Sequence, residues 1–368
     1  MKINMENERI KRKHLHWLRS AKRYSEDTIQ AYERAVETWE AYTHCRDFHR
    51  ITTKVAGDFS DWVNDQVRSG KTLSASTRYQ IVRLVRSFYE WLATQPGRSS
   101  KAITVALSYL SVERKTVMEA SSPGRRDVPT LAYIQKLANS ISISTELDRR
   151  DRALISFLLL SGARTSAVAT LPLGCFDTES LMVYQDPKQG VKTKNGKYIP
   201  TRLFVADRTL LGYVLEWVDF LRREKLFGDH DPLFPRTRVA QEAGGLAFEA
   251  KDVVPVFWKS GGPIDSMVKS RALAAGLRPY HCHAFRHTIA RLAMSKARSG
   301  EELKAISQNL GHAHFETTAV VYGHLDDSKV AEVMESMNFE PVSKRPSASD
   351  KLKDLARKVL EDDLTDED

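Results

Sequence analysis

The sequence predicts a mainly α-helical protein of two domains, with a small β-sheet or hairpin in the second domain. Apolar residues recur at helical spacing in the first part of the chain, and a stretch rich in Ser, Pro, Gly and Arg interrupts the pattern at 119–129. Beyond it, two strand-like runs flank an Asn-Gly pair. The length of 368 residues is enough for two domains of ordinary size.

The first domain is predicted to be all-helical. One helical face carries apolar residues at spacings of 3, 4 and 3, preceded by Ser25 as N-cap: Ile29, Tyr32, Val36 and Trp39. A second helix, about 77–92, directs one set of side chains to a core: Ile81, Leu84, Phe88 and Trp91. Its outer face carries charged residues: Arg83, Arg86 and Glu90. With the basic run Lys11-Arg12-Lys13, these arginines are predicted to neutralise phosphates of a polyanion.

The second region is predicted to mix helices and strands. The apolar run 153–160 predicts a buried helix, and strands are expected at 181–185 and 197–204. Between the strands, Asn195-Gly196 predicts a hairpin turn, because both turn positions require positive φ. Three further helices are expected at 263–275, 283–296 and 301–310. The last is predicted to begin with a capping box of Ser299 and Glu302 and to end at Gly311.

Charge favours a nucleic-acid partner. The net charge is +9, and the segment 350–368 contributes −4, so residues 1–349 carry +13. Ribosomal and membrane-surface proteins are also basic, so charge alone does not decide the class. The three cysteines are too few and too scattered for a disulfide framework, which favours a reducing, intracellular setting. No run approaches the ~20 apolar residues of a membrane span, and the charged N-terminus does not resemble a secretory leader. A cytoplasmic protein without a membrane partner is therefore expected.

Two local patterns contain basic residues that could take part in chemistry. Arg164 follows a Gly-Ala turn after the buried helix, so its guanidinium could be held rigidly in a cleft or could be an ordinary surface group. Lysines cluster around the Asn-Gly turn: Lys192, Lys194 and Lys197. Such lysines can reach a DNA groove, donate a proton or simply solubilise the turn.

Two further patterns lie near the C-terminus. His283 and Arg286, at i and i+3, are expected to project together opposite an apolar helical stripe. The neighbouring His281, Cys282 and His287 permit a metal site, but the carboxylates of a hydrolytic metal site are absent from this segment, and no metal ligand is assigned. His312 follows a helix stop, and Tyr322 lies on a short apolar stretch where a tyrosine is either core or nucleophile.

Taken together, these residue types suit phosphoryl transfer without a metal or other cofactor. Two arginines can stabilise charge on the non-bridging oxygens of a phosphodiester, and two histidines can hydrogen-bond the same oxygens. A lysine can protonate the leaving 5′ oxygen, and a tyrosine can attack the phosphorus. In this sequence the six residues are Arg164, Lys192, His283, Arg286, His312 and Tyr322.

The order and spacing of these six residues resemble the tyrosine recombinase (phage integrase) family. The resemblance extends to Gly-Ala-Arg at 162–164, Leu-Gly-His at 310–312, paired threonines at 317–318, and the eight-residue step from Lys192 to Pro200. It covers about residues 16–330 and includes the helical region 16–115, which is similar to the family's core-binding domain.

The resemblance implies five regions and a defined chemistry. These regions are a basic extension at 1–15, a helical core-binding domain at 16–118, a linker at 119–129, a mixed α+β catalytic domain at 130–335, and a tail at 336–368 that could be exchanged between subunits. Members attack DNA to form a 3′-phosphotyrosyl link and a free 5′ hydroxyl. They act as tetramers on two duplexes at specific sites, through a Holliday junction, and accessory recombinases or element-encoded proteins can assist them. Neither ATP nor metal is required.

Two departures and several alternatives accompany the resemblance. Many members have an acidic residue at the position of Ala167, and in many the tyrosine lies nine positions after the histidine, whereas Tyr322 lies ten positions after His312. Lys194 is a rival for the role of Lys192, and is otherwise expected to contact DNA. Integration, excision or transposition of a mobile element is the favoured function. The alternatives are a chromosome-dimer-resolving recombinase and a DNA-binding protein without catalysis.

Overall fold

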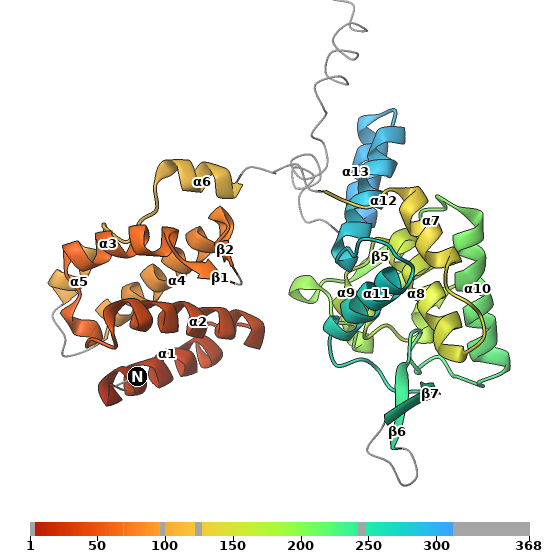
Figure 1. Ribbon diagram of the computed structural model, residues 1–368, viewed down its shortest axis with the longest axis horizontal. Coiled ribbons are helices and arrows are strands. Elements are labelled where there is room, and N and C mark those ends of the chain that lie inside the picture. The colour runs from red at the N-terminus through yellow and green to blue at the C-terminus, as the bar shows by residue number, and fades with distance from the viewer. Residues whose placement is uncertain (1–3, 69, 96–99, 122–126, 242–247, 312–368) are drawn as a thin grey trace, which may run out of the picture. The chain divides into compact units, whose positions relative to one another are not determined.

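The computed structural model describes residues 4–68, 70–95, 100–121, 127–241 and 248–311. The chain divides into two compact units between Arg126 and Asp127. Each unit has its own hydrophobic core. The fold is mainly helical with small antiparallel sheets, as the sequence predicts (Figure 1).

The first unit is built from helices around an aromatic core. Its helices are α1 (Met5–Ser20), α2 (Glu26–Thr43), the 3₁₀ turn η1 (Phe48–Arg50), α3 (Thr53–Asn64), α4 (Ala75–Ala93), α5 (Ser100–Leu107) and α6 (Arg114–Ser121). Two antiparallel strands of two residues each, β1 (Val67–Arg68) and β2 (Lys71–Thr72), lie between α3 and α4. The Ser25 hydroxyl accepts a hydrogen bond from the Thr28 amide, and the apolar face of α2 is buried, so both predictions for this helix are confirmed.

The sequence-based boundaries of the first unit need two corrections. Residues 5–15 are no separate extension, because they belong to α1, whose inner face is buried at Asn7, Ile10, His14 and Leu18. The helix α6 continues to Ser121, so it occupies the start of the stretch expected to be a linker. Short-range composition indicated a break in the chain correctly, but did not indicate how far the packed helix extends.

His14 gives the first unit a predictable sensitivity to acid. Its ring is 1% exposed and lies among Trp17, Tyr32, Phe88 and Trp91. Burial lowers the pKa of His14 from its ordinary value of 6.5 to about 4. The unfolded chain therefore binds a proton first as the pH falls, and stability is lost progressively below pH 6.5 until the folded pKa is reached.

We expect the free energy of unfolding to fall by about 2 kcal/mol between pH 7 and pH 5 because of this residue. Urea unfolding of the wild type and of His14→Phe at both pH values measures the effect. Phenylalanine keeps an aromatic ring in the cage and cannot titrate, so the variant should show a smaller decrease. An equal decrease in both proteins would assign the acid sensitivity to other groups.

The second unit is arranged around the buried helix α8 (Glu146–Ser161), which lies between α10 (Arg208–Arg223) and α12 (Cys282–Lys296) (Figure 1). Its other helices are α7 (Leu131–Asn139), α9 (Thr165–Val168), α11 (Gly262–Ala274) and α13 (Gly300–Asn309), with 3₁₀ turns η2 (Leu173–Cys175), η3 (Pro187–Gln189) and η4 (Lys194–Gly196). The apolar run 153–160 is buried throughout, which confirms the prediction of a central helix.

Two small antiparallel sheets accompany these helices. The first has the order β3-β4-β5, with β3 (Phe176–Asp177), β4 (Met182–Gln185) and β5 (Ile199–Arg202). The second is a hairpin of β6 (Arg236–Gln241) and β7 (Phe248–Val254). Sequence periodicity did not indicate this second hairpin.

The Asn-Gly turn has the predicted backbone but does not join the strands directly. Asn195 has φ 62° and Gly196 has φ 63°, as a turn of this type requires. The paired strands β4 and β5 stop short of it, and residues 186–198 connect them through η3 and η4. The pairing prediction is confirmed, but local turn chemistry does not set the strand register.

The ends of α13 follow their predicted signals only in part. The Ser299 hydroxyl accepts from the Glu302 amide, and Gly311 has the left-handed φ of 68° suited to a C′ position. The Glu302 carboxylate, however, accepts from the Arg298 amide rather than from the amide of the cap residue. Of the predicted capping box, only the bond to the Ser299 hydroxyl is formed.

Candidate active site

Four of the six candidate catalytic residues lie in the described part of the second unit: Arg164, Lys192, His283 and Arg286. His312 and Tyr322 lie outside the described residues. The four come from three segments, since His283 and Arg286 both lie on α12, and their arrangement depends on the contacts of α12 with the ends of α8 and α13.

Arg164 lies where the central helix ends. It is the N-cap residue of α9, with φ −74° and ψ 144°, and it is half-buried. Two residues earlier, Gly162 ends α8 with a left-handed φ of 57°. A Cβ at Gly162 would lie 2.9 Å from Leu310 Cδ2 and 3.2 Å from Ile289 Cγ2. Glycine is required here both by the backbone and by the close approach of α12 and α13.

Arg286 joins the C-terminal ends of two helices. It is only 3% exposed, and its guanidinium donates through Nη1 to the Gly162 carbonyl at 2.6 Å and through Nη2 to the Leu310 carbonyl. These carbonyls belong to the C-cap residues of α8 and α13, whose last carbonyls have no partner within their own helix. The positive charge also suits the negative ends of both helix dipoles. Arg286 thereby fixes the two segments that lead to Arg164 and to residue 312.

The prediction that His283 and Arg286 project together is wrong for Arg286. His283 is exposed on α12, whereas Arg286 and His287 are buried. The physical reason is that the buried carbonyls at the helix ends need donors, and Arg286 is the residue on α12 placed to supply them. The rings of His283 and His287 meet edge to face, with centroids 4.9 Å apart.

Lys192 is held at two points beside α9. Its backbone amide donates to the Thr170 hydroxyl at 2.8 Å, and its ammonium Nζ donates to the Lys259 carbonyl at 3.2 Å. The side chain remains exposed. Lys194 is also exposed and begins η4. The fixed backbone of Lys192 favours it over Lys194 as the catalytic lysine.

The lysine-bearing connection and the end of α13 are fastened together through β5. Asn309 accepts from the Arg202 amide at 2.7 Å and donates its side-chain amide to the Arg202 carbonyl at 2.9 Å. The Thr201 hydroxyl donates to the Asn309 carbonyl at 2.9 Å. A Cβ at Gly311 would lie 2.7 Å from side-chain atoms of Ile199. The strand that follows Lys192 thus positions the segment that precedes residue 312.

Cys282, which precedes His283, does not have the properties of a metal ligand. Burial raises the pKa of the Cys282 thiol, and the adjacent Asp265 carboxylate raises it further, so the thiolate that would bind a metal is disfavoured. Within the described ranges, no three side chains of His, Cys, Asp or Glu come together as ligands. Ala167, at the position where many members of the resembled family have an acidic residue, is 2% exposed and offers no carboxylate to Arg164.

The predicted DNA-contacting residues divide into two groups. Arg12, Lys13, Arg83 and Lys194 are exposed, and Arg86 is exposed but paired with Glu90 at 3.1 Å. Lys11 has another role: its ammonium lies 2.6 Å from Glu40 and is also paired with Glu8. Burial lowers the pKa of Lys11, but these two carboxylates outweigh it, so the pKa is raised. Lys11 is therefore not expected to contact DNA.

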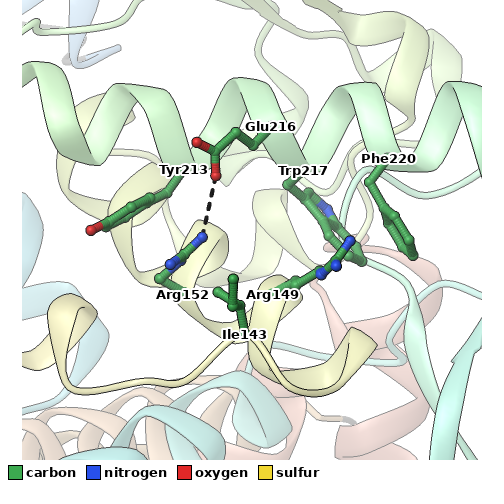
Figure 2. Close-up of a pocket in the computed structure, with 7 residues that line it drawn as sticks. All are labelled: Ile143, Arg149, Arg152, Tyr213, Glu216, Trp217 and Phe220. Atoms are coloured by element: carbon green, nitrogen blue, oxygen red, sulfur yellow. Dashed lines mark hydrogen bonds and ion pairs between the residues drawn. The ribbon is translucent and has the colours of Figure 1, made fainter.

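A surface pocket lies between α8 and α10, apart from these residues. Figure 2 shows its lining, where Arg152 pairs with Glu216 at 3.2 Å and the Arg149 guanidinium lies 5.1 Å from the Phe220 ring centroid. None of the described candidate catalytic residues lines this pocket. Sequence reasoning also missed Thr170, Lys259 and Gly261, which support the site. For Lys259 and Gly261 the local signal is the Ser-Gly-Gly-Pro sequence at 260–263, and Thr170 has none there.

The sequence of this chain matches known families in both units. Residues 131–329 match the phage integrase family, and residues 12–96 match the N-terminal SAM-like domain of phage integrases. The chain belongs to the phage integrase family. This integrase-family chain is 24% identical over 321 residues to tyrosine recombinase XerD of Listeria monocytogenes, an alignment covering 87% of the chain and 95% of XerD. It is 24% identical over 337 residues to tyrosine recombinase XerC of Escherichia coli, covering 90% and 96% respectively.

Solved structures show that the integrase-family chain shares their fold. A XerH site-specific recombinase bound to a palindromic difH substrate has a TM-score of 0.59 at 18% identity, covering 88% of this chain and 83% of that one. A lambda integrase dimer bound to a COC′ core site has a TM-score of 0.59 at 16% identity, with coverage of 92% and 80%. Among the described helices of the integrase-family chain, none is long and apolar enough to cross a membrane.

Proposed function

We propose that this protein is a site-specific DNA recombinase that cleaves and rejoins strands through a covalent link between Tyr322 and a 3′ phosphate. The observation that carries the proposal is the placement of Arg286. Its two hydrogen bonds join the end of α8, which leads to Arg164, to the end of α13, which leads to His312. Side chains from several segments that are joined in this way can together stabilise the charge on one phosphate group.

Each residue has a distinct role in the proposed reaction. Arg164 and Arg286 stabilise the charge that develops on the non-bridging oxygens of the scissile phosphate. His283 and His312 hydrogen-bond these oxygens and assist proton movement, while Lys192 protonates the leaving 5′ oxygen. The Tyr322 oxygen bonds to phosphorus as the bond to the 5′ oxygen breaks. The resulting phosphotyrosyl ester retains the energy needed for rejoining.

The proposed partner is double-stranded DNA with specific recombination sites, bound by a homotetramer on two duplexes. A lambda integrase tetramer has been solved on a Holliday junction, and the structural likeness to that protein supports the same kind of assembly here. Exposed Arg12, Lys13, Arg83 and Arg86 are proposed to contact phosphates, so binding should weaken steeply as salt rises. Accessory recombinases or proteins of the same mobile element could join the assembly, and the cytoplasm of a prokaryotic cell, in contact with the nucleoid, is the proposed location.

The test is covalent trapping on a nicked suicide substrate, from which the strand beyond the cleavage site diffuses away. A wild-type protein that forms an adduct on its own site supports the proposal. If the protein binds this DNA but forms no adduct, the result supports the alternative hypothesis, a DNA-binding protein without catalysis.

Chelation should leave the reaction unchanged. Two arginines provide the positive charge that metal ions supply in many nucleases. We therefore expect EDTA to alter the rate of adduct formation by less than about twofold, since no step of the proposed mechanism uses a metal. The control adds back zinc or magnesium after chelation. A large loss that one of these metals restores would contradict the arginine-based mechanism.

Chromosome-dimer resolution is the second candidate function. The similarity to XerC and XerD extends over 95% or more of those proteins, which favours it. The acidic segment 350–368 favours a mobile element instead. Deleting the gene distinguishes them: chromosome dimers should accumulate in one case, and movement of a linked element should stop in the other.

A further inference from the structure

The segment 258–261, between β7 and α11, contacts the surroundings of two candidate catalytic residues. Gly261 packs directly on Thr165, the residue after Arg164. A Cβ at Gly261 would lie 2.7 Å from Thr165 Cβ and 3.1 Å from the Thr165 carbonyl carbon. Two residues earlier, the Lys259 carbonyl accepts the hydrogen bond from Lys192 Nζ. One short segment therefore reaches both the arginine turn and the lysine.

The segment is anchored to the base of the β6–β7 hairpin. The Trp258 indole Nε1 donates to the Phe234 carbonyl at 2.7 Å. The Arg150 guanidinium lies 5.1 Å from the Trp258 ring centroid and donates to the Pro235 carbonyl at 3.1 Å and to the Thr237 hydroxyl at 2.9 Å. Trp258 is thus held by a hydrogen bond at its edge and a cation–π contact with Arg150.

Arg150 is itself fixed by a network of charges on α8 and α11. It is 3% exposed and pairs with Asp151 at 2.8 Å. Asp151 also accepts from Arg271, which pairs with Asp148 as well. Burial lowers the pKa of Arg271, but the two carboxylates outweigh it and raise the pKa, so this arginine stays charged. A network in which every charge has a partner, with Arg150 and Asp151 buried, gives the segment a rigid base.

We propose that the segment 258–261 is a positioning element that holds Arg164 and Lys192 in their reactive places. Position 167 supplies no side-chain polar contact to Arg164, since Ala167 is buried and has no polar side-chain group. The proposal rests on the catalytic roles assigned to Arg164 and Lys192 in the proposed function. Gly261 acts on the arginine turn, and Trp258 acts on the lysine through Lys259.

A pair of adjacent glycines allows a matched test on the arginine side. Gly261 has φ −73° and ψ −15°, a backbone that alanine adopts without strain, so Gly261→Ala acts only through its contact with Thr165. At Gly262 the nearest atom to an added Cβ is Ser260 Oγ at 3.7 Å, an ordinary contact. Single-turnover adduct formation at saturating DNA should fall about 10- to 100-fold in Gly261→Ala and less than about twofold in Gly262→Ala.

A second-site change separates displacement from misfolding. Thr165→Gly removes the two atoms that the new methyl group would meet most closely, Oγ1 at 2.6 Å and Cβ at 2.7 Å, and leaves the longer contact with the carbonyl carbon at 3.1 Å. The double variant should therefore be close in rate to Thr165→Gly alone, and DNA affinity should stay unchanged throughout, because the segment is proposed to act on the reaction and not on binding. A global folding defect would lower DNA affinity and would not be relieved by the second change.

The lysine side is tested with DNA carrying sulfur in place of the bridging 5′ oxygen. A thiolate leaves without protonation, so a defect in proton donation by Lys192 should disappear on this substrate. Trp258→Phe keeps a ring beside Arg150 but loses the hydrogen bond to Phe234. Trp258→Phe should cleave ordinary DNA about 10-fold more slowly than the wild type and the sulfur substrate at nearly the wild-type rate. Lys192→Ala should show a larger defect on ordinary DNA and should likewise cleave the sulfur substrate at nearly the wild-type rate.

The outcomes separate this inference from the function on which it rests. A wild-type protein that forms no adduct overturns the proposed function. A wild-type protein that cleaves, with Gly261→Ala and Gly262→Ala equal in rate, overturns the positioning role on the arginine side. The sulfur substrate could restore the cleavage rate of Lys192→Ala but not that of Trp258→Phe. That result overturns the role of the segment in positioning the lysine.

Discussion

Tyr322→Phe is expected to abolish covalent protein–DNA adducts while leaving DNA affinity unchanged. Phenylalanine keeps the ring but lacks the oxygen that bonds to phosphorus, so no side-chain nucleophile remains at that position. Adduct formation on a nicked suicide substrate should fall by at least about 1,000-fold, since the variant loses the covalent route entirely. Gel separation of the trapped complex and a binding titration on the same DNA measure both quantities.

The matched control is Tyr280→Phe, which removes the hydroxyl of the nearest upstream tyrosine in the sequence. Tyr280 lies just before α12 and its hydroxyl is 3.3 Å from the Asp127 carboxylate. Its loss should leave adduct formation within about twofold of the wild type, because the residue is not assigned to the reaction. Persistent adducts in Tyr322→Phe would mean that another residue is the nucleophile, and peptide mapping of the DNA-linked fragment would identify it.

Arg286→Lys is expected to impair both cleavage and folding stability. Lysine keeps the positive charge, but one ammonium cannot reproduce the planar fork that reaches the carbonyls of Gly162 and Leu310. A buried carbonyl left without a donor costs about 1–3 kcal/mol. Single-turnover cleavage should fall about 100- to 1,000-fold, since the variant loses both phosphate recognition and the alignment of the α8 and α13 ends.

The control for this substitution is Arg278→Lys, at a side chain that is 71% exposed and paired with Asp127 on the surface. Exposed pairs contribute about 0–1 kcal/mol, so this variant should melt and cleave like the wild type. Thermal melting and single-turnover cleavage of the two variants give the comparison. If Arg286→Lys cleaved normally, Arg286 would be a structural cap of two helices and not a catalytic residue.

The residue types of the candidate site could be predicted from the sequence, because chemistry restricts which side chains can serve it. The order and spacing of residues in the sequence identify four candidate catalytic residues of the described site: Arg164, Lys192, His283 and Arg286. Their relative exposure could not be predicted. Spacing on a helix placed His283 and Arg286 on one side, but only the packing of α12 against two helix ends determined that Arg286 is buried.

Local sequence alone determined the elements that depend on neighbouring residues. These are the helical faces of the first unit, the buried helix at 153–160, the positive φ of Asn195 and Gly196, and the end of α13 at Gly311. Tertiary structure decided the rest: the inclusion of α1 in the first core, the register of β4 with β5, and the support of Lys192 by Lys259. The reason is that these contacts join residues distant in the sequence: 14 to 20 positions apart in the β4–β5 register, and 67 positions apart for Lys192 and Lys259. Their free energy depends on burial and on hydrogen bonds that no short window of sequence contains.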